Sequence, residues 1–205
     1  MAKAVRTFIA IELPQEVREY LESRQTDLAS AGGDVKWVRP DDIHLTLAFL
    51  GNVPVEEIAA VAAAVRGAAA SMGPIRLRAG GAGCFPPHGR PRVVWIGIEE
   101  PTGALARLQG AVAEATERFA ERSERREYKA HLTVGRVRGP ASSRCVGTTP
   151  RQAGGAEELS EAVAALADAE GPEFEAAEVV IFESVLAREG PMYMPLARVP
   201  FGTPV

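Results

Sequence analysis

The sequence contains two nearly identical tetrapeptides, His44-Leu45-Thr46-Leu47 and His131-Leu132-Thr133-Val134. Their histidines lie 87 residues apart, a little under half of the 205-residue chain. One His-x-Thr-x segment carries little information, because many strands with alternating apolar residues contain it. Two copies at this spacing indicate a repeated unit in which each copy supplies the same two polar side chains.

Apolar and polar residues alternate through both tetrapeptides, which predicts a β-strand at each. Because successive side chains of a strand point to opposite faces, His44 and Thr46 should share one face, as should His131 and Thr133. The opposite face of the first strand should hold the apolar residues Ile43, Leu45, Leu47 and Phe49. In each copy, therefore, we expect an imidazole and a hydroxyl to point away from the core together.

If a pseudo-two-fold axis relates the copies, both pairs face one cleft. Two imidazoles provide a proton donor and a proton acceptor near neutral pH, and two hydroxyls can donate hydrogen bonds to phosphate oxygens. These groups are sufficient for phosphodiester chemistry without a metal. Two cleft histidines with no accompanying Asp/Glu cluster make a poor metal site, so we expect neither a metal nor another cofactor.

The rest of the chain mixes helical and strand patterns. We expect helices at about 14–31, 54–71, 103–121 and 157–168, strands at about 5–12, 35–38, 43–50, 75–77, 92–99, 131–137, 178–184 and 192–199, and a Gly/Pro-rich loop at 80–90. The helices do not alternate one for one with the strands, as they would in a doubly wound sheet. The pattern therefore favours an α+β fold with antiparallel sheets.

Composition favours one globular domain, with 46% hydrophobic and 24% charged residues. The net charge of −4 excludes a basic surface over the whole domain, so any contact with nucleic acid must be local. No stretch approaches the roughly 20 apolar residues of a membrane span, and the first residues lack the apolar core of a secretory signal. We expect a cytoplasmic monomer with no membrane contact. Cys84 and Cys145 lack the spacing of a zinc site and should be structural thiols.

Further segments extend the pattern beyond the two tetrapeptides: 6–11, 37–40, 44–51, 85–87, 90–97, 131–136 and 193–198. In these segments, and in their order and spacing, the chain resembles the RNA 2′,3′-cyclic phosphodiesterases, also called 2′-5′ RNA ligase or LigT-like proteins, of the 2H phosphoesterase superfamily. The resemblance implies a single domain over residues 1–205. It would consist of two pseudo-symmetric lobes, each an antiparallel sheet backed by helices, with one motif in each lobe and a central cleft between them.

The resemblance also implies a role for each site residue. His44 would be the proton donor to the leaving 3′ oxygen, and His131 the proton acceptor that activates water. Thr46 and Thr133 would hold the phosphate. Arg136 matches a family position that contacts the phosphate.

Three of the candidate residues raise questions of geometry. Simple alternation turns Arg136 to the face opposite His131, unless Gly135 permits a bulge or the long side chain curls back. Phe8 and Tyr193 could stack a nucleobase. For Phe8, a place in the core is an equal alternative.

The leading hypothesis is an enzyme that opens the 2′,3′-cyclic phosphate at RNA 3′ ends, tRNA fragments among them, or in small cyclic nucleotides, leaving a 2′-phosphate. By microscopic reversibility, the same site could join such an end to a 5′-hydroxyl through a 2′-5′ linkage. Hydrolysis should prevail in water at about 55 M unless binding holds the second RNA end in place. The alternative is a non-catalytic nucleotide- or RNA-end-binding module, against which the intact pairs of His and Thr argue.

Overall fold

The structure, a computed structural model, describes residues 3–87, 89–122, 127–138, 155–187 and 190–202. The strands are β1 Ala4–Ile11, β2 Val35–Trp37, β3 Leu45–Pro54, β4 Ile75–Phe85, β5 Val93–Glu99, β6 His131–Val137, β7 Glu170–Ala176, β8 Glu178–Ala187 and β9 Gly190–Pro200. The α-helices are α1 Gln15–Ser30, α2 Ile58–Ala69, α3 Ala104–Thr116 and α4 Gly155–Ala165, and the short 3₁₀ turns are η1 Pro40–Asp42, η2 Val55–Glu57 and η3 Glu117–Phe119. No helix in these ranges combines the length and the hydropathy that a membrane span needs.

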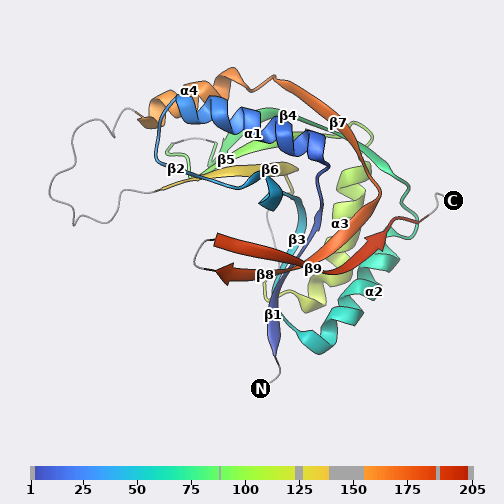
Figure 1. Ribbon diagram of the computed structural model, residues 1–205. Helices are drawn as coiled ribbons and strands as arrows, with labels where there is room; N and C mark the ends of the chain where they lie inside the picture. Colours follow the sequence, from blue (N-terminus) through green and yellow to red (C-terminus); the bar gives the residue numbers. More distant parts are fainter. Residues whose placement is uncertain (1–2, 88, 123–126, 139–154, 188–189, 203–205) are drawn as a thin grey trace.

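The strands form two antiparallel sheets (Figure 1). The first has the order β3-β1-β8-β9, and the second has the order β2-β6-β5-β4-β7. Each sheet takes strands from both ends of the chain, since β8 and β9 join the N-terminal β1 and β3, whereas β2 joins the second sheet. The first tetrapeptide enters β3 and the second opens β6, so each sheet carries one motif. The predicted α+β fold with antiparallel sheets is confirmed.

The helices tie the two sheets together. α2 and α3 pack on the first sheet through β9 and β3, and α1 and α4 pack on the second sheet through β7 and β4 (Figure 1). α1 therefore follows a strand of the first sheet but covers the second. One hydrophobic core runs through both sheets, and Leu45, Ile96 and Leu132 lie fully buried within it.

Two elements differ from the sequence-based expectation. β4 continues to Phe85 through the expected loop, because its glycines allow close packing: a Cβ on Gly83 would lie 2.2 Å from the Trp95 ring. β7 was not expected, since Gly171 and Pro172 resemble a turn. It lies at the edge of its sheet, where a strand tolerates a proline.

β3 contains two extra residues relative to β1. Ala10 pairs with Thr46 but Ile9 pairs with Ala48, and the pairing skips again before Gly51. Each extra residue resets the alternation of faces. As a result Thr46 and Phe49 lie on the same face, the one opposite the main core. The expectation that Phe49 packs in the core is wrong, because its side chain is 64% exposed.

β6 contains a similar bulge. Thr133 pairs with Trp95 and Gly135 with Val94, so Val134 is the extra residue. The bulge returns Arg136 to the face of Thr133, as the glycine at position 135 allows. The buried amide of Gln25 on α1 supports this backbone, since its Nε2 donates to the carbonyl oxygen of Val134 at 2.8 Å and to that of Val38 at 2.6 Å.

Substituting Gly135 should test the packing around this bulge. A Cβ there would lie 2.6 Å from Cγ1 of Val35 and 3.0 Å from the Trp37 ring. We expect Gly135→Ala to lower the free energy of unfolding by about 1–3 kcal/mol, measured by urea denaturation. Gly110→Ala, inside α3 with open space around the new methyl group, should instead stabilise the protein by about 0.5–1 kcal/mol. Equal responses of the two variants would contradict this account of β6.

Candidate active site

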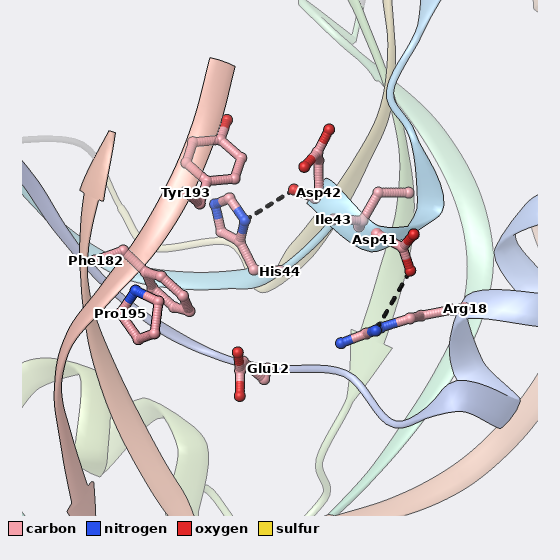
Figure 2. A pocket seen from close by; sticks show the side chains of 9 residues that line it. All are labelled: Glu12, Arg18, Asp41, Asp42, Ile43, His44, Phe182, Tyr193 and Pro195. Atoms are coloured by element: carbon pink, nitrogen blue, oxygen red, sulfur yellow. Dashed lines mark hydrogen bonds and ion pairs between the residues drawn. The ribbon is translucent and has the colours of Figure 1, made fainter. Parts of the chain in front are cut away.

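His44 is presented by the turn that precedes β3. η1 ends at Asp42, and the carbonyl oxygen of Asp42 lies 3.0 Å from Nδ1 of His44 (Figure 2). A carbonyl oxygen only accepts hydrogen bonds, so Nδ1 carries a hydrogen and donates it. The other ring nitrogen, Nε2, is then the atom that gains or loses a proton.

His131 is held in the same way at the start of β6. Its Nδ1 lies 2.6 Å from the carbonyl oxygen of Lys129, again two residues earlier in the chain. The same reasoning leaves Nε2 of His131 for proton transfer. The two tetrapeptides thus share not only their sequence pattern but also a hydrogen bond to the backbone that fixes the tautomer of each imidazole.

Aromatic rings pack around His44. The Phe8 ring stacks on the imidazole with a centroid distance of 4.6 Å, and the ring of Tyr193 meets it edge-on at 5.0 Å. The Phe182 ring stacks on Phe8 at 5.2 Å. Phe8 is only 3% exposed, so its ring packs against the imidazole and has no free face on which a nucleobase could stack. Tyr193 lies beside the imidazole, with its hydroxyl at the far end of the ring (Figure 2).

His131 has an aromatic support of its own. The Phe85 ring meets its imidazole edge-on at 5.0 Å and lies 5.5 Å from the Trp95 ring. Nζ of Lys129 lies 4.3 Å from the centroid of Trp95, a cation–π contact. Sequence reasoning missed Phe85, Trp95 and Phe182 as neighbours of the histidines. No local sequence signal would have found them, because only the strand register places their side chains on the same face as the motifs.

Several contacts bring the two sheets together at the motifs. The hydroxyl of Tyr128, just before β6, donates to the carbonyl oxygen of Thr46 at 3.3 Å, and β3 contacts β6 directly. Burial raises the pKa of Tyr193; the field of Asp42 acts in the same direction, and the fields of Arg136 and Arg6 oppose it. Arg136 of the second sheet thus lies near enough to act on the hydroxyl of a first-sheet residue.

The environment of His44 disfavours its charged form. Desolvation lowers the pKa of His44 from 6.5 to about 4, and the hydrogen bond to Asp42 only partly offsets this effect. Without a ligand, the imidazole is therefore neutral at pH 7.

A small cavity of about 100 Å³ opens beside His44 (Figure 2). Its walls include Glu12, Arg18 and Asp41, and an ion pair of 3.4 Å joins Arg18 to Asp41. Glu12 accepts a hydrogen bond from Arg198 at 2.6 Å, so these charges are compensated within the protein. The described residues contain no group of three His, Cys, Asp or Glu side chains that could hold a metal ion.

The threonine hydroxyls and Arg136 are open to a ligand. The described part of the chain offers no hydrogen-bond partner to the side chain of Thr46 or Thr133, and no ion pair to Arg136. Thr46 pairs with Ala10 and so lies on the face of Phe8, and the bulge in β6 sets Arg136 on the face of Thr133. Of these predicted site residues and the two histidines, only His44 lines the cavity described above. Together the five side chains supply two imidazoles, two hydroxyls and a guanidinium.

Comparison with known proteins yields relatives over nearly the whole chain. An RNA 2′,3′-cyclic phosphodiesterase of Methanothermobacter thermautotrophicus is 32% identical over 189 residues, covering 92% of this chain and 95% of that protein. One of Thermus thermophilus is 37% identical, covering 67% of this chain and 71% of that protein.

Solved structures agree with this relationship. A Thermus thermophilus crystal structure superposes with a TM-score of 0.75 at 28% identity, covering 97% of this chain and 98% of that one. E. coli LigT in complex with NADP⁺ gives 0.68 at 25% identity, covering 97% and 99%. Residues 11–95 and 96–193 each match the pattern of one family, and the chain belongs to that family, the LigT like phosphoesterases.

Proposed function

We propose that the chain hydrolyses the 2′,3′-cyclic phosphate at the 3′ end of RNA, leaving a 2′-phosphate, with His44 as proton donor and His131 as proton acceptor. The observation that carries the proposal is the hydrogen bond from each Nδ1 to a backbone carbonyl, which leaves two Nε2 atoms for proton transfer. The relatives named above are RNA 2′,3′-cyclic phosphodiesterases, which agrees with this activity.

The reaction needs one proton removed and one supplied. Nε2 of His131 takes a proton from the attacking water as its oxygen bonds to phosphorus. The bond from phosphorus to the 3′ oxygen breaks, and Nε2 of His44 protonates that oxygen. The products are a 2′-phosphate monoester and a 3′-hydroxyl, and the net proton transfer from His44 to His131 is reversed through solvent before the next turnover.

The phosphate is bound by neutral donors and one cation. The hydroxyls of Thr46 and Thr133 donate to its non-bridging oxygens, and Arg136 balances its charge. Hydrogen bonds to an anionic oxygen are stronger than those between neutral groups, so they favour the charge that develops in the transition state.

The low pKa of His44 links its protonation to substrate binding. A neutral imidazole accepts protons, so a donor role requires that His44 be charged before the bond breaks. A phosphodiester anion beside the ring favours the charged form and raises the pKa. Without substrate, the His44 ring is therefore neutral. The negative charge of the bound substrate favours protonation of Nε2, which makes His44 a proton donor.

Other parts of the proposal follow from this activity. The proposed site draws all its groups from one chain, which supports action as a monomer. We place that action in the cytoplasm on RNA ends, tRNA fragments included.

The reverse reaction, 2′-5′ ligation, needs a 5′-hydroxyl in the position of the water. A purely binding module would use the threonines and Arg136 but would not need two imidazoles with fixed tautomers.

The decisive experiment is an assay on a short RNA with a 2′,3′-cyclic phosphate, with EDTA present. We expect turnover to a 2′-phosphate, identified by mass spectrometry as the hydrolysed product and by chromatography against authentic 2′-phosphate and 3′-phosphate standards. A 3′-phosphate product, or activity that disappears on chelation and returns with zinc or manganese, would refute the two-histidine mechanism.

Replacing either histidine should remove one proton transfer. General acid or base catalysis contributes about 10²–10⁴-fold, so His44→Ala and His131→Ala should each lower kcat/KM by at least that much. The double variant should lose less than the product of the single losses, because both groups act in one transition state. His88→Ala, at the remaining histidine of the chain, is the control. A folded single variant with near-normal turnover would leave the binding-module alternative.

Replacing the threonine hydroxyls should weaken binding of the phosphate while sparing the fold. Valine keeps the shape and strand preference of threonine, so Thr46→Val and Thr133→Val test the hydroxyl alone. Each should cost about 1.5–3 kcal/mol in kcat/KM, tenfold or more. Thr26→Val, at an exposed position of α1, is the control and should leave kcat/KM unchanged. Wild-type kinetics in the two motif variants would show that these residues serve only the strands.

The lowered pKa of His44 should make folding sensitive to acid. The unfolded chain binds the proton at about the ordinary pKa of 6.5, and the folded protein only at about 4. The stability tied to the neutral ring is thus complete above pH 6.5 and is lost as the pH falls toward 4. Linkage predicts a loss of about 2 kcal/mol between pH 7.5 and pH 5. Urea denaturation in phosphate-free buffer at both pH values measures the free energy of unfolding of the wild type and of His44→Gln. The wild type should lose about 2 kcal/mol more than the variant. Identical pH dependence in both proteins would contradict the burial of a neutral imidazole.

A further inference from the structure

The face of the first sheet that carries Phe8 and Thr46, here called the motif face, is laid out in rows that run away from His44. The register places Thr46 beside Ala10, then Phe49 beside Phe8, and then Asn52 beside Arg6. Residues two apart on a strand are separated by about 7 Å, so these rows extend well beyond the phosphate-binding threonine. The site described above uses only the part of this face nearest the histidine.

Phe49 is the exposed aromatic residue of this surface. Its side chain is 64% exposed, and its ring centroid lies 6.0 Å from that of Phe8. Phe8 itself is buried, with its ring stacked on His44 and Phe182. The bulge at Leu47 brings Phe49 to the motif face, whereas unbroken alternation from Thr46 would have turned it into the core. A largely exposed ring, continuous with the aromatic support of His44, can stack a planar group.

Arg6 places a positive charge on the same face. Its side chain is exposed, and the described residues supply no ion-pair partner for it. The guanidinium acts on the pKa of Tyr193, so its field extends toward the middle of the site. Glu121 is the nearby carboxylate, and it accepts a hydrogen bond from Asn52 at 2.8 Å rather than pairing with Arg6. A guanidinium with no ion-pair partner among the described residues, beside an exposed ring, complements the charge and the bases of a single RNA strand.

We propose that Phe49 and Arg6 bind the nucleotide upstream of the cyclic phosphate. The base of that nucleotide stacks on Phe49, and the phosphodiester that joins it to the terminal nucleotide is bound by Arg6. The inference rests on the proposed function and narrows its substrate class. The enzyme selects RNA ends of two or more nucleotides over free nucleoside cyclic phosphates, which reach only the inner part of the site.

The test compares adenosine 2′,3′-cyclic phosphate with the dinucleotide ApA bearing the same cyclic end. The wild type should show the higher kcat/KM on the dinucleotide. Phe49→Leu should lower the ratio of the two values by about tenfold, whereas Phe49→Trp, which keeps a stacking ring, should preserve it. Arg6→Gln should also lower the ratio. With a longer RNA, it should reduce the slope of log(kcat/KM) against log salt by about 0.7, the value for one phosphate contact on a single strand.

Arg66→Gln is the matched control, because it removes the same charge from an exposed position on α2, away from the motif face. It should change neither the ratio nor the salt slope. A wild-type ratio near one, or equal losses on both substrates in Phe49→Leu, would overturn the outer site. A change in sedimentation coefficient in Phe49→Leu would identify the face as an interface between copies, which also overturns it. If the wild type hydrolyses neither substrate, the proposed function itself fails.

Discussion

Side chains of a β-strand alternate between its two faces. In a sheet with one buried face, a strand departs from this alternation only where it contains an extra residue that the neighbouring strand lacks. β3 and β6 both present several polar or aromatic groups on the face opposite the core while keeping leucine and valine in the core. Each does so by accommodating extra residues. The bulges at Leu47 and Val134 let an apolar side chain enter the core without moving the next functional residue to the wrong face. Which side chains share a face with the two motifs depends on this local change of register.

The backbone and the neighbouring side chains determine different properties of the two histidines. The backbone fixes the tautomer, because a carbonyl two residues earlier in the chain accepts the Nδ1 hydrogen in both motifs. The aromatic neighbours set the surroundings and differ between the two sites. His44 lies against Phe8 and Tyr193, whereas His131 meets the edge of Phe85. One geometry repeated in two environments provides two imidazoles that need not behave alike.

Local pattern was sufficient to predict the α+β class, most elements and the two motifs, because a strand with one buried face shows its period in the sequence. Register was not predictable in this way. The place of Phe49, the return of Arg136 to the face of Thr133 and the stacking of Phe182 on Phe8 all depend on which residues oppose one another across the strands. Glycines misled the prediction at β4, where Gly83 serves close packing against Trp95 rather than a turn. Gly135 did carry a usable signal, since a strand glycine beside a motif indicates a bulge.

The interleaving of the sheets has a consequence for synthesis of the protein. β1 lies between β3 and β8, so Phe8 reaches its partner Phe182 only across most of the length of the chain. Pairings this distant in sequence form slowly, because the entropy of closing a long loop is lost before the contacts compensate for it. Both histidines leave the ribosome well before β8 and β9. Phe182 and Tyr193 are therefore the last neighbours to reach His44, and its aromatic surroundings are complete only once β8 and β9 have been made.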